Sequence, residues 1–392
     1  MSDMLRALPS IKERPVPLAR PPPNVLTPAR DRSSSDTDPD ASSSDSSAST
    51  IDSINTLKPS ESNPQTTSSP SISWSSYFAQ ELHLPHETST HKAQYHCYFT
   101  PPASTKTGPL FICHHGAGAS AMSFAPFAAS LRTLMPSAGI LSLSAREHGS
   151  TITTTSPEAA DPDFSIPALV SDALTTINLL KSHLSWSDLP PTVFIGHSLG
   201  GVVATHIASS ASLGPSLIGF LVLDVVEGSA LEALAYMKTY LASRPARFDT
   251  VPDAVDWHVR SRVLRDPAAA AISVPSLLTR LDDGGWGWRT DLSRTQTWWE
   301  DWFKGMSGLF LRGRAAKGLV LAGTDRLDKE LMVGQMQGRF QLTVLPEAGH
   351  FVHEDCAEKM AGLAVEFFRR NDRSQMVLPP KVGELLAMGK KV

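Results

Sequence analysis

Apolar residues along most of the chain follow two alternating patterns. Short, continuous apolar runs such as 110–113 and 217–223 alternate with longer segments in which apolar residues recur every three or four positions. In one of these segments Leu169, Ala173 and Ile177 would share one face of a helix. Apolar strands separated by amphipathic helices are typical of a mainly parallel sheet that helices cover on both faces. The pattern therefore predicts an α/β fold.

The alternation of strands and helices is absent from two long stretches. Residues 1–72 are rich in Pro, Ser, Thr and Asp, and such a segment buries too little apolar surface to offset its ordering entropy, so we expect it to be disordered. Residues 229–310 are helix-forming and rich in Trp, and the strand pattern resumes only after them. An insertion between two strands, at the carboxyl edge of a sheet, is typical of a lid over a site. The predicted parts are a disordered segment (1–72), a first core part (73–228), a helical lid (229–310), a last core part (311–371) and a C-terminal tail (372–392).

Four aromatic residues of the insertion, Trp298, Trp299, Trp302 and Phe303, have helical spacing. This spacing predicts that they form the core of the lid. The alternative is that one of the rings faces a substrate or a partner.

Composition and charge exclude several classes of protein. The formal net charge of −4 argues against a general nucleic-acid binder, which would present a basic face. The longest apolar run, 217–223, is far shorter than the roughly 20 residues needed to span a bilayer. The N-terminus lacks the apolar segment of a secretory signal, and three cysteines without metal-ligand spacing indicate a reducing compartment. We expect an intracellular protein without membrane spans, located in the cytoplasm or the nucleus.

A serine between glycines is the first candidate for chemistry. Residues 196–200 read G-H-S-L-G and lie between an apolar run and a helix with small residues. Such a sharp strand-to-helix turn presents a nucleophilic serine, and small flanking residues let the backbone turn without a clash. Ser198 is therefore the predicted nucleophile.

Two backbone N–H groups are candidates for binding the oxyanion that such a nucleophile creates. One belongs to Leu199, which directly follows the serine at the start of the helix. The other belongs to Ala117, in the glycine-rich loop after an earlier strand. His114 and His115 precede this loop, but adjacent residues on a strand end point to opposite sides, so we expect no metal site there.

The general base and the acid that orients it are expected near the ends of later strands. The base should lie in the loop after the last strand, where we favour His350 over His353, which falls in the next helix. Asp224 ends the strand that follows the helix of the nucleophile. Asp325 ends the next strand, with Asp328 close behind it. Either strand end could reach the histidine, so position alone does not separate Asp224 from Asp325.

Several longer segments resemble the protein phosphatase methylesterases. The resemblance includes GHSLGG (196–201) and rests above all on LDVVEG (223–228) and DRLDKELMVGQMQG (325–338), which are not features of general esterases. It implies an α/β-hydrolase fold with an inserted helical lid. The implied activity is that of a serine carboxylesterase, which removes the methyl ester from the C-terminal leucine of the type-2A protein phosphatase catalytic subunit. In this family the acid lies in the LDVVEG segment, which corresponds to Asp224.

The resemblance also implies a partner and the absence of a cofactor. The implied partner is the catalytic subunit of the type-2A phosphatase and its holoenzymes, and the chemistry needs no metal or organic cofactor. Asp325 is the fallback if Asp224 is not the acid. Two other functions stay open: a small-molecule carboxylesterase of the same fold, and a protein that binds and inhibits the phosphatase with catalysis secondary.

Overall fold

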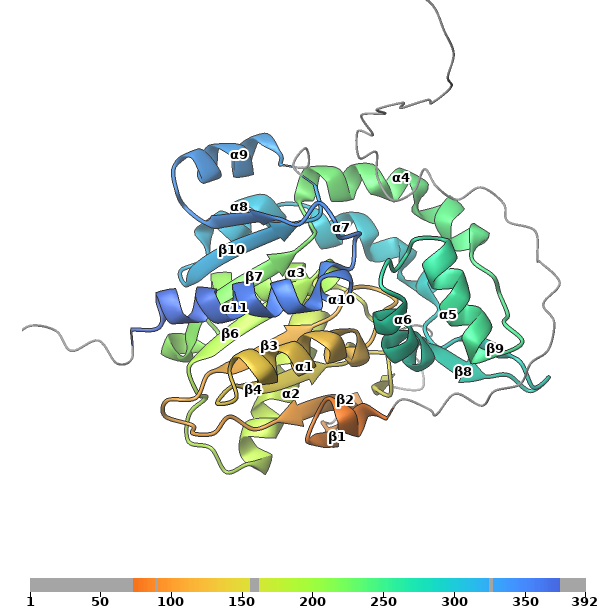
Figure 1. Cartoon of the computed structure of the whole chain (residues 1–392), viewed down its shortest axis with the longest axis horizontal. Coiled ribbons are helices and arrows are strands. Elements are labelled where there is room, and N and C mark those ends of the chain that lie inside the picture. The colour runs from red at the N-terminus through yellow and green to blue at the C-terminus, as the bar shows by residue number, and fades with distance from the viewer. Residues whose placement is uncertain (1–72, 89–90, 156–161, 324–326, 374–392) are drawn as a thin grey trace, which may run out of the picture. The chain divides into compact units, whose positions relative to one another are not determined.

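The structure is a computed structural model that describes residues 73–88, 91–155, 162–323 and 327–373. The predicted segment 1–72, most of the predicted C-terminal tail and the fallback acid Asp325 lie outside these residues. Figure 1 labels the strands and helices of the described part of the chain.

A sheet of nine strands forms the centre of the described residues. Its strands are β1 (Gln80–Glu87), β2 (His91–Thr100), β3 (Leu110–His114), β4 (Gly139–Leu143), β5 (Ile152–Thr155), β6 (Thr192–His197), β7 (Leu217–Leu223), β10 (Ala316–Leu321) and β11 (Gln341–Val344). They lie in the order β1-β2-β4-β3-β6-β7-β10-β11, and β5 pairs with β2. All pairs from β4 to β11 in this order are parallel, whereas β2 is antiparallel to β1, β4 and β5. The predicted mainly parallel α/β sheet is confirmed.

Helices cover both faces of this sheet, as the sequence predicted. They are α1 (Ala125–Leu134), α2 (Ile166–His183), α3 (Leu199–Ser210), α8 (Met306–Arg312), α9 (Lys329–Met336), α10 (Val352–Asp355) and α11 (Ala357–Asn371). In Figure 1, α1 and α11 lie in front of the sheet and contact each other. Helices α2, α3 and α8 lie behind it, where α3 packs against β6 and β7.

Side chains on the central strands alternate between two faces that are both buried. On β3, Leu110 and Ile112 join the core on the side of α2 and α3, whereas Phe111 and Cys113 join the core on the side of α1 and α11. A strand buried on both faces has no polar alternation, which explains the continuous apolar runs in the sequence. On β6, Phe194 is fully buried against α2 and α3.

The segment between β7 and β10 forms the insertion. It contains α4 (Glu227–Ser243), α5 (Val251–Arg260), α6 (Pro267–Ser273), β8 (Leu278–Arg280), β9 (Trp286–Trp288) and α7 (Trp299–Phe303) before α8. It is mainly helical, as predicted, and the antiparallel pair β8–β9 adds a small second sheet that the sequence did not indicate. Residues of α5, α6 and β8 build a core of their own. Hydrogen bonds join the insertion to the sheet loops: for example, Ser276 Oγ lies 2.6 Å from Ser120 Oγ, and the Thr290 hydroxyl donates to the Glu147 carbonyl at 2.8 Å.

The aromatic residues of the insertion do not form the separate lid core that their spacing predicted. Trp299, Trp302 and Phe303 are buried in the core that covers the sheet, and Trp298 packs against that core at its edge. The Trp302 indole N–H donates to the carbonyl of Phe164, just before α2. These rings therefore fasten the insertion to the α2–α3 side of the sheet.

None of the described helices is both long and apolar enough to cross a membrane.

Burial of the central strand predicts the cost of removing a core ring. Phe194→Ala should lower the free energy of unfolding by about 3–5 kcal/mol, because the lost contacts leave a cavity in a fully packed face. Urea unfolding of the purified protein measures this change. Met336→Ala, at a side chain that is 79% exposed, is the control and should shift the free energy by no more than about 0.5 kcal/mol. Equal effects of the two substitutions would contradict the burial of β6.

Candidate active site

Ser198 occupies a strained turn between β6 and α3. Its backbone has φ 50° and ψ −120°, and it is the N-cap residue of α3. A non-glycine residue with positive φ costs of the order of 1–3 kcal/mol and persists only where the surroundings enforce it. The turn follows the carboxyl end of a parallel strand, where open α/β sheets bind ligands.

The glycines on either side of the serine allow this turn through close backbone contacts. A Cβ at Gly196 would lie 2.1 Å from the carbonyl oxygen of Gly200. A Cβ at Gly200 would lie 2.1 Å from the carbonyl oxygen of His114, at the end of β3. Neither position can carry a side chain unless the backbone moves, which is the physical reason for the G-x-S-x-G spacing.

Asp224 and His350 are joined by a hydrogen bond. His350 Nδ1 donates to Asp224 Oδ2 at 2.8 Å, and the Asp224 side chain is fully buried. The backbone N–H of Ala322, just after β10, donates to the other carboxylate oxygen at 2.8 Å. A carboxylate at Nδ1 fixes the tautomer of the imidazole and leaves Nε2 as the nitrogen that can accept a proton.

The loop that carries His350 is anchored on two sides. Asp355 Oδ2 accepts the Gly349 N–H at 2.7 Å, and Asp355 Oδ1 accepts the N–H of Arg265 from the insertion at 2.7 Å. On the other side, His197 Nε2 donates to the His350 carbonyl at 2.9 Å, and the two rings lie 4.7 Å apart between centroids. His350 is thereby held beside the residue that precedes Ser198.

The serine and the histidine are not hydrogen-bonded to each other in this arrangement. Among the described residues, no side chain forms a hydrogen bond with the Ser198 hydroxyl, whereas the His350–Asp224 bond is in place. Bonds between a nucleophile and its base are often long in the absence of substrate and tighten in the complex. The structure thus brings Asp224 to His350 and sets Ser198 on the adjacent turn.

The other candidate acids and bases have different environments. His353, in α10, is completely buried and stacks on Phe124 at 4.3 Å between ring centroids. Burial lowers the pKa of His353 to about 3. Asp328 is the N-cap of α9, where one carboxylate oxygen accepts the Leu331 N–H at 2.9 Å and the other accepts the Ser307 hydroxyl at 2.5 Å. These contacts assign His353 to packing and Asp328 to helix capping.

The two predicted oxyanion donors lie on adjoining segments. Leu199 is the first residue of α3, so its N–H has no acceptor within the helix. Ala117 lies in a turn closed by the Ala119 N–H, which donates to the Gly116 carbonyl at 3.2 Å. A Cβ at Gly116 would lie 2.9 Å from the Ser198 Cβ, so this turn passes directly beside the nucleophile.

Two buried histidines fix the loop around Ala117, and the sequence did not indicate this role. His148 Nε2 accepts the Gly118 N–H at 2.9 Å, while its Nδ1 donates to the Arg146 carbonyl at 2.8 Å. His115 Nδ1 donates to the Gly116 carbonyl at 2.7 Å, and its Nε2 accepts the Ala145 N–H at 3.0 Å. Burial lowers the pKa of both histidines, so each imidazole is neutral and uses one nitrogen as donor and the other as acceptor.

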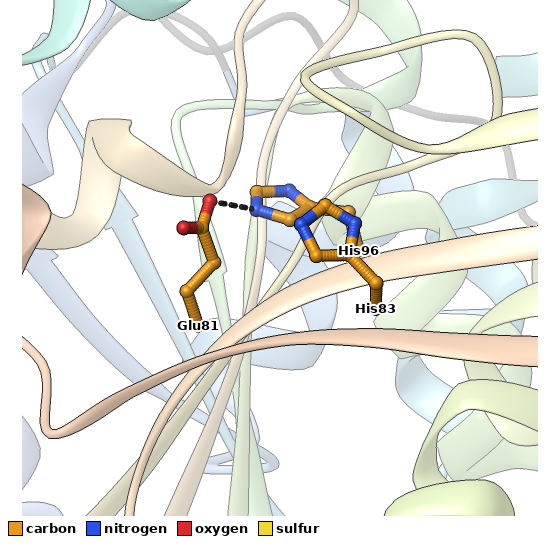
Figure 2. Close-up of side chains that lie close together, drawn as sticks. All are labelled: Glu81, His83 and His96. Atoms are coloured by element: carbon orange, nitrogen blue, oxygen red, sulfur yellow. Dashed lines mark hydrogen bonds and ion pairs between the residues drawn. The ribbon is translucent and has the colours of Figure 1, made fainter.

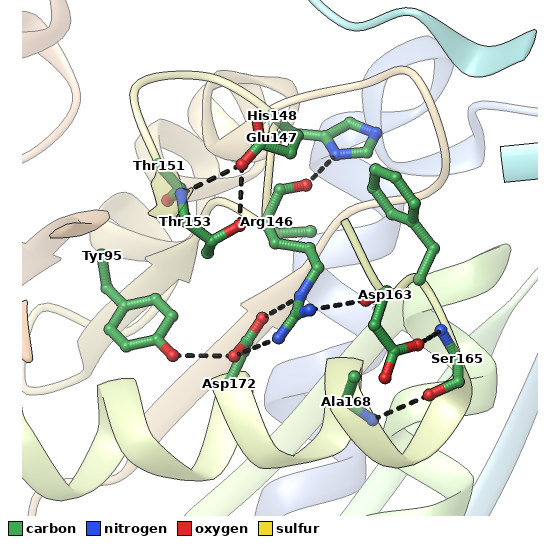
Figure 3. A network of polar contacts seen from close by, with 12 residues as sticks. Tyr95, Arg146, Glu147, His148, Thr151, Thr153, Asp163, Ser165, Ala168 and Asp172 are labelled. Atoms are coloured by element: carbon green, nitrogen blue, oxygen red, sulfur yellow. Dashed lines mark hydrogen bonds and ion pairs between the residues drawn. The ribbon is translucent and has the colours of Figure 1, made fainter. Parts of the chain in front are cut away.

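A buried ion pair supports the segment that carries His148. Figure 3 shows the Arg146 guanidinium facing the Asp172 carboxylate on α2, with Nε to Oδ2 at 2.5 Å and Nη2 to Oδ1 at 2.8 Å. The Tyr95 hydroxyl donates to the same carboxylate at 2.7 Å, and Arg146 Nη1 donates to the Asp163 carbonyl at 2.5 Å. A buried pair of charges is tolerated when such additional hydrogen bonds satisfy it. Sequence spacing did not reveal this network, because its members lie on four separate segments.

The chain is similar to known proteins over most of its length. The alpha/beta hydrolase family model matches residues 111–363. Protein phosphatase methylesterase 1 of Aspergillus fumigatus is 47% identical over 400 residues, which cover 99% of this chain and 93% of the relative. Protein phosphatase methylesterase 1 of Schizosaccharomyces pombe is 43% identical, over 79% of this chain and 88% of the relative.

Solved structures agree at the level of the fold. The crystal structure of E-2-(acetamidomethylene)succinate hydrolase is similar with a TM-score of 0.56 and 16% identity, over 74% of this chain and 100% of that chain. The Mycobacterium tuberculosis esterase Rv0045c is similar with a TM-score of 0.51 and 17% identity, over 74% of this chain and 92% of that chain.

The buried imidazole of His353 predicts a pH-dependent stability. Its pKa is about 3 in the folded chain and about 6.5 in the unfolded chain, so the unfolded chain binds the proton first as the pH falls. This contribution to the free energy of unfolding is complete above about pH 6.5 and is lost as the pH falls toward 3. The loss amounts to about 2 kcal/mol at pH 5. His353→Phe keeps the stacking on Phe124 and should reduce the loss of unfolding free energy between pH 7 and pH 5 by about that amount.

Urea unfolding at the two pH values measures this difference. His183→Phe, which replaces an exposed histidine, serves as the control and should keep the pH dependence of the wild type. An unchanged pH dependence in His353→Phe would contradict the assignment of a neutral buried imidazole.

Proposed function

We propose that this chain, which belongs to the protein phosphatase methylesterase family, removes the methyl ester from the C-terminal leucine of the type-2A protein phosphatase catalytic subunit. The proposed catalyst is a triad of Ser198, His350 and Asp224 that works through an acyl-enzyme. The observation that carries the proposal is the hydrogen bond of 2.8 Å between His350 and the buried Asp224, beside the strained turn of Ser198. The relatives named above supply the class of substrate.

In the proposed first step, the Ser198 hydroxyl attacks the ester carbonyl and His350 Nε2 takes its proton. Asp224 holds the resulting imidazolium through Nδ1 and stabilises its charge. The N–H groups of Leu199 and Ala117 bind the oxyanion, because they are fixed before the reaction and need no reorganisation. Methanol then leaves with the proton from His350.

In the second step, a water molecule hydrolyses the acyl-enzyme. His350 removes a proton from the water, which attacks the acyl carbonyl, and the same N–H groups bind the second oxyanion. The proton returns to the Ser198 oxygen, and the leucine carboxylate is released. Each step transfers protons through one imidazole, so the described residues supply all the groups that this route requires.

The LDVVEG segment supports a link between the triad and the insertion. Asp224 is followed three residues later by Glu227, whose carboxylate oxygens accept the Gly305 N–H at 2.7 Å and the Ser307 N–H at 3.0 Å. The segment that supplies the proposed acid therefore also ties the start of α4 to the start of α8. This double role favours a site in which the insertion and the triad are positioned together.

Removal of the nucleophile should abolish the reaction. Ser198→Ala should lower kcat by about 10⁴- to 10⁶-fold, because members of a triad act as a unit. Release of methyl groups from the methylated phosphatase catalytic subunit measures the rate, and a pull-down checks that the variant still binds it. Methyl release at the wild-type rate would overturn the proposal. Fast turnover of small acyl esters with indifference to the phosphatase would favour a small-molecule carboxylesterase instead.

Parallel substitutions separate the two candidate acids. Asp224→Asn should lower kcat by about 10⁴-fold, because a neutral amide neither fixes the required tautomer nor stabilises the imidazolium. Asp325→Asn is the matched variant and should retain most of the activity in the same methyl-release assay. A larger loss in Asp325→Asn than in Asp224→Asn would transfer the acid to Asp325.

A further inference from the structure

Three side chains with metal-ligating atoms converge on the edge of the sheet, away from the triad. Glu81 and His83 lie two residues apart on β1 and so point to the same face of the strand. His96 lies on β2 and is paired with His83 in the antiparallel register. Figure 2 shows the Glu81 carboxylate facing the His96 ring, with the His83 ring beside it.

The separations of these side chains suit a single ion. Among the residues that the structure describes, these three form the one set whose ligand atoms lie within 4.8 Å of one another. Glu81 Oε1 lies 3.0 Å from His96 Nε2, and the rings of His83 and His96 are 5.0 Å apart between centroids. Tetrahedral zinc, with bonds of about 2.0–2.1 Å, separates its ligands by about 3.4 Å. Small rotations of Glu81 and the exposed His83 side chain would close the remaining distance.

The buried His96 is oriented from behind, as metal-binding histidines commonly are. Its Nδ1 lies 3.0 Å from the Ser144 hydroxyl, and this contact directs Nε2 toward Glu81 and His83. In the present arrangement Nε2 donates to Glu81 and the hydroxyl donates to Nδ1. A hydroxyl is both donor and acceptor, so the contact persists when a metal at Nε2 moves the ring proton to Nδ1. A neutral imidazole is the form of histidine that ligates a metal.

Charged groups near the cluster have opposite effects on a cation bound there. The Glu81 carboxylate attracts a cation and raises the pKa of His96, whereas Arg289 from the insertion is close enough to lower it. The Arg289 guanidinium is held by the Leu278 carbonyl at 3.0 Å and repels a cation. Tyr98 shares the Glu81 carboxylate through a hydrogen bond. These groups weaken the site without blocking the ligand atoms.

We propose that Glu81, His83 and His96 bind one zinc ion, with water in the remaining position. A ligand set of two imidazoles and a carboxylate binds zinc in preference to magnesium or calcium, because those two ions prefer oxygen ligands alone. The ion joins the edge strand β1 to β2. Through the contact of His96 with Ser144, it also braces the segment that leads to Arg146 and His148. This site is independent of the proposed esterase reaction.

Titration of the metal-free full-length chain with zinc chloride tests the site. Isothermal titration calorimetry should show one zinc ion per chain, and zinc at about 100-fold above its dissociation constant should raise the melting temperature by about 5 °C. His83→Ala and Glu81→Gln should each weaken binding by more than about 10-fold, because loss of a ligand exceeds the effect of an outer contact. Ser144→Ala should weaken it by about 10-fold. Cobalt should give the visible absorption bands of a four-coordinate ion, and these bands should be lost in His83→Ala.

Two matched controls locate the ion. His86→Ala removes a neighbouring histidine of β1 that is outside the cluster, and His350→Ala removes the histidine of the proposed triad; both should bind zinc as the wild type does. His83 is exposed, so His83→Ala should melt at the wild-type temperature without zinc. The proposal is overturned by the absence of saturable binding, by binding that survives both His83→Ala and Glu81→Gln, or by binding that is lost in His350→Ala.

Discussion

The close approach of α3 to β3 is the constraint on which the site depends. The backbone of Gly200 passes so near to the carbonyl of His114 that no side chain fits between them, and Gly196 is packed equally tightly against Gly200. This packing holds Ser198 at a positive φ, and the strain of about 1–3 kcal/mol is offset by the surrounding structure. The same approach sets the first turn of α3 beside the loop that follows β3. One contact between two elements therefore positions both the serine and the N–H groups of Leu199 and Ala117.

Neutral imidazoles support this arrangement where charged groups would disturb it. His115, His148 and His197 each form a hydrogen bond with the backbone, and burial lowers the pKa of all three. A neutral imidazole offers a donor and an acceptor in a dry interior without the large cost of burying a charge. Because none of the three is a cation, none competes with His350 for the Asp224 carboxylate. The nearby charges of Arg146 and Asp172 neutralise each other at short distance.

The sequence predicted those features that local spacing encodes. Continuous apolar runs and helical periodicity sufficed for the mainly parallel sheet and its covering helices, because both faces of the sheet are buried. The G-x-S-x-G spacing pointed to Ser198 because the clashes that demand it arise within a few residues. The role of His148 could not be predicted in this way, since its partner Gly118 is thirty residues away. The placement of Trp302 was missed for the same reason: helical spacing shows that a ring is buried, but not which core receives it.

The choice between two aspartates shows where spacing rules stop. Strands β7 and β10 are neighbours, so a loop that runs from β11 back to His197 on β6 passes the carboxyl ends of both. Asp224 is the residue directly after β7, and its backbone adopts φ 48°, a conformation that aspartate tolerates better than most residues. This turn of the backbone brings its side chain to His350. The end of β10 then contributes a backbone donor, the N–H of Ala322, to the same carboxylate. The contact between Asp224 and His350 thus depends on the backbone turn directly after β7. The spacing of residues along the chain does not predict that turn.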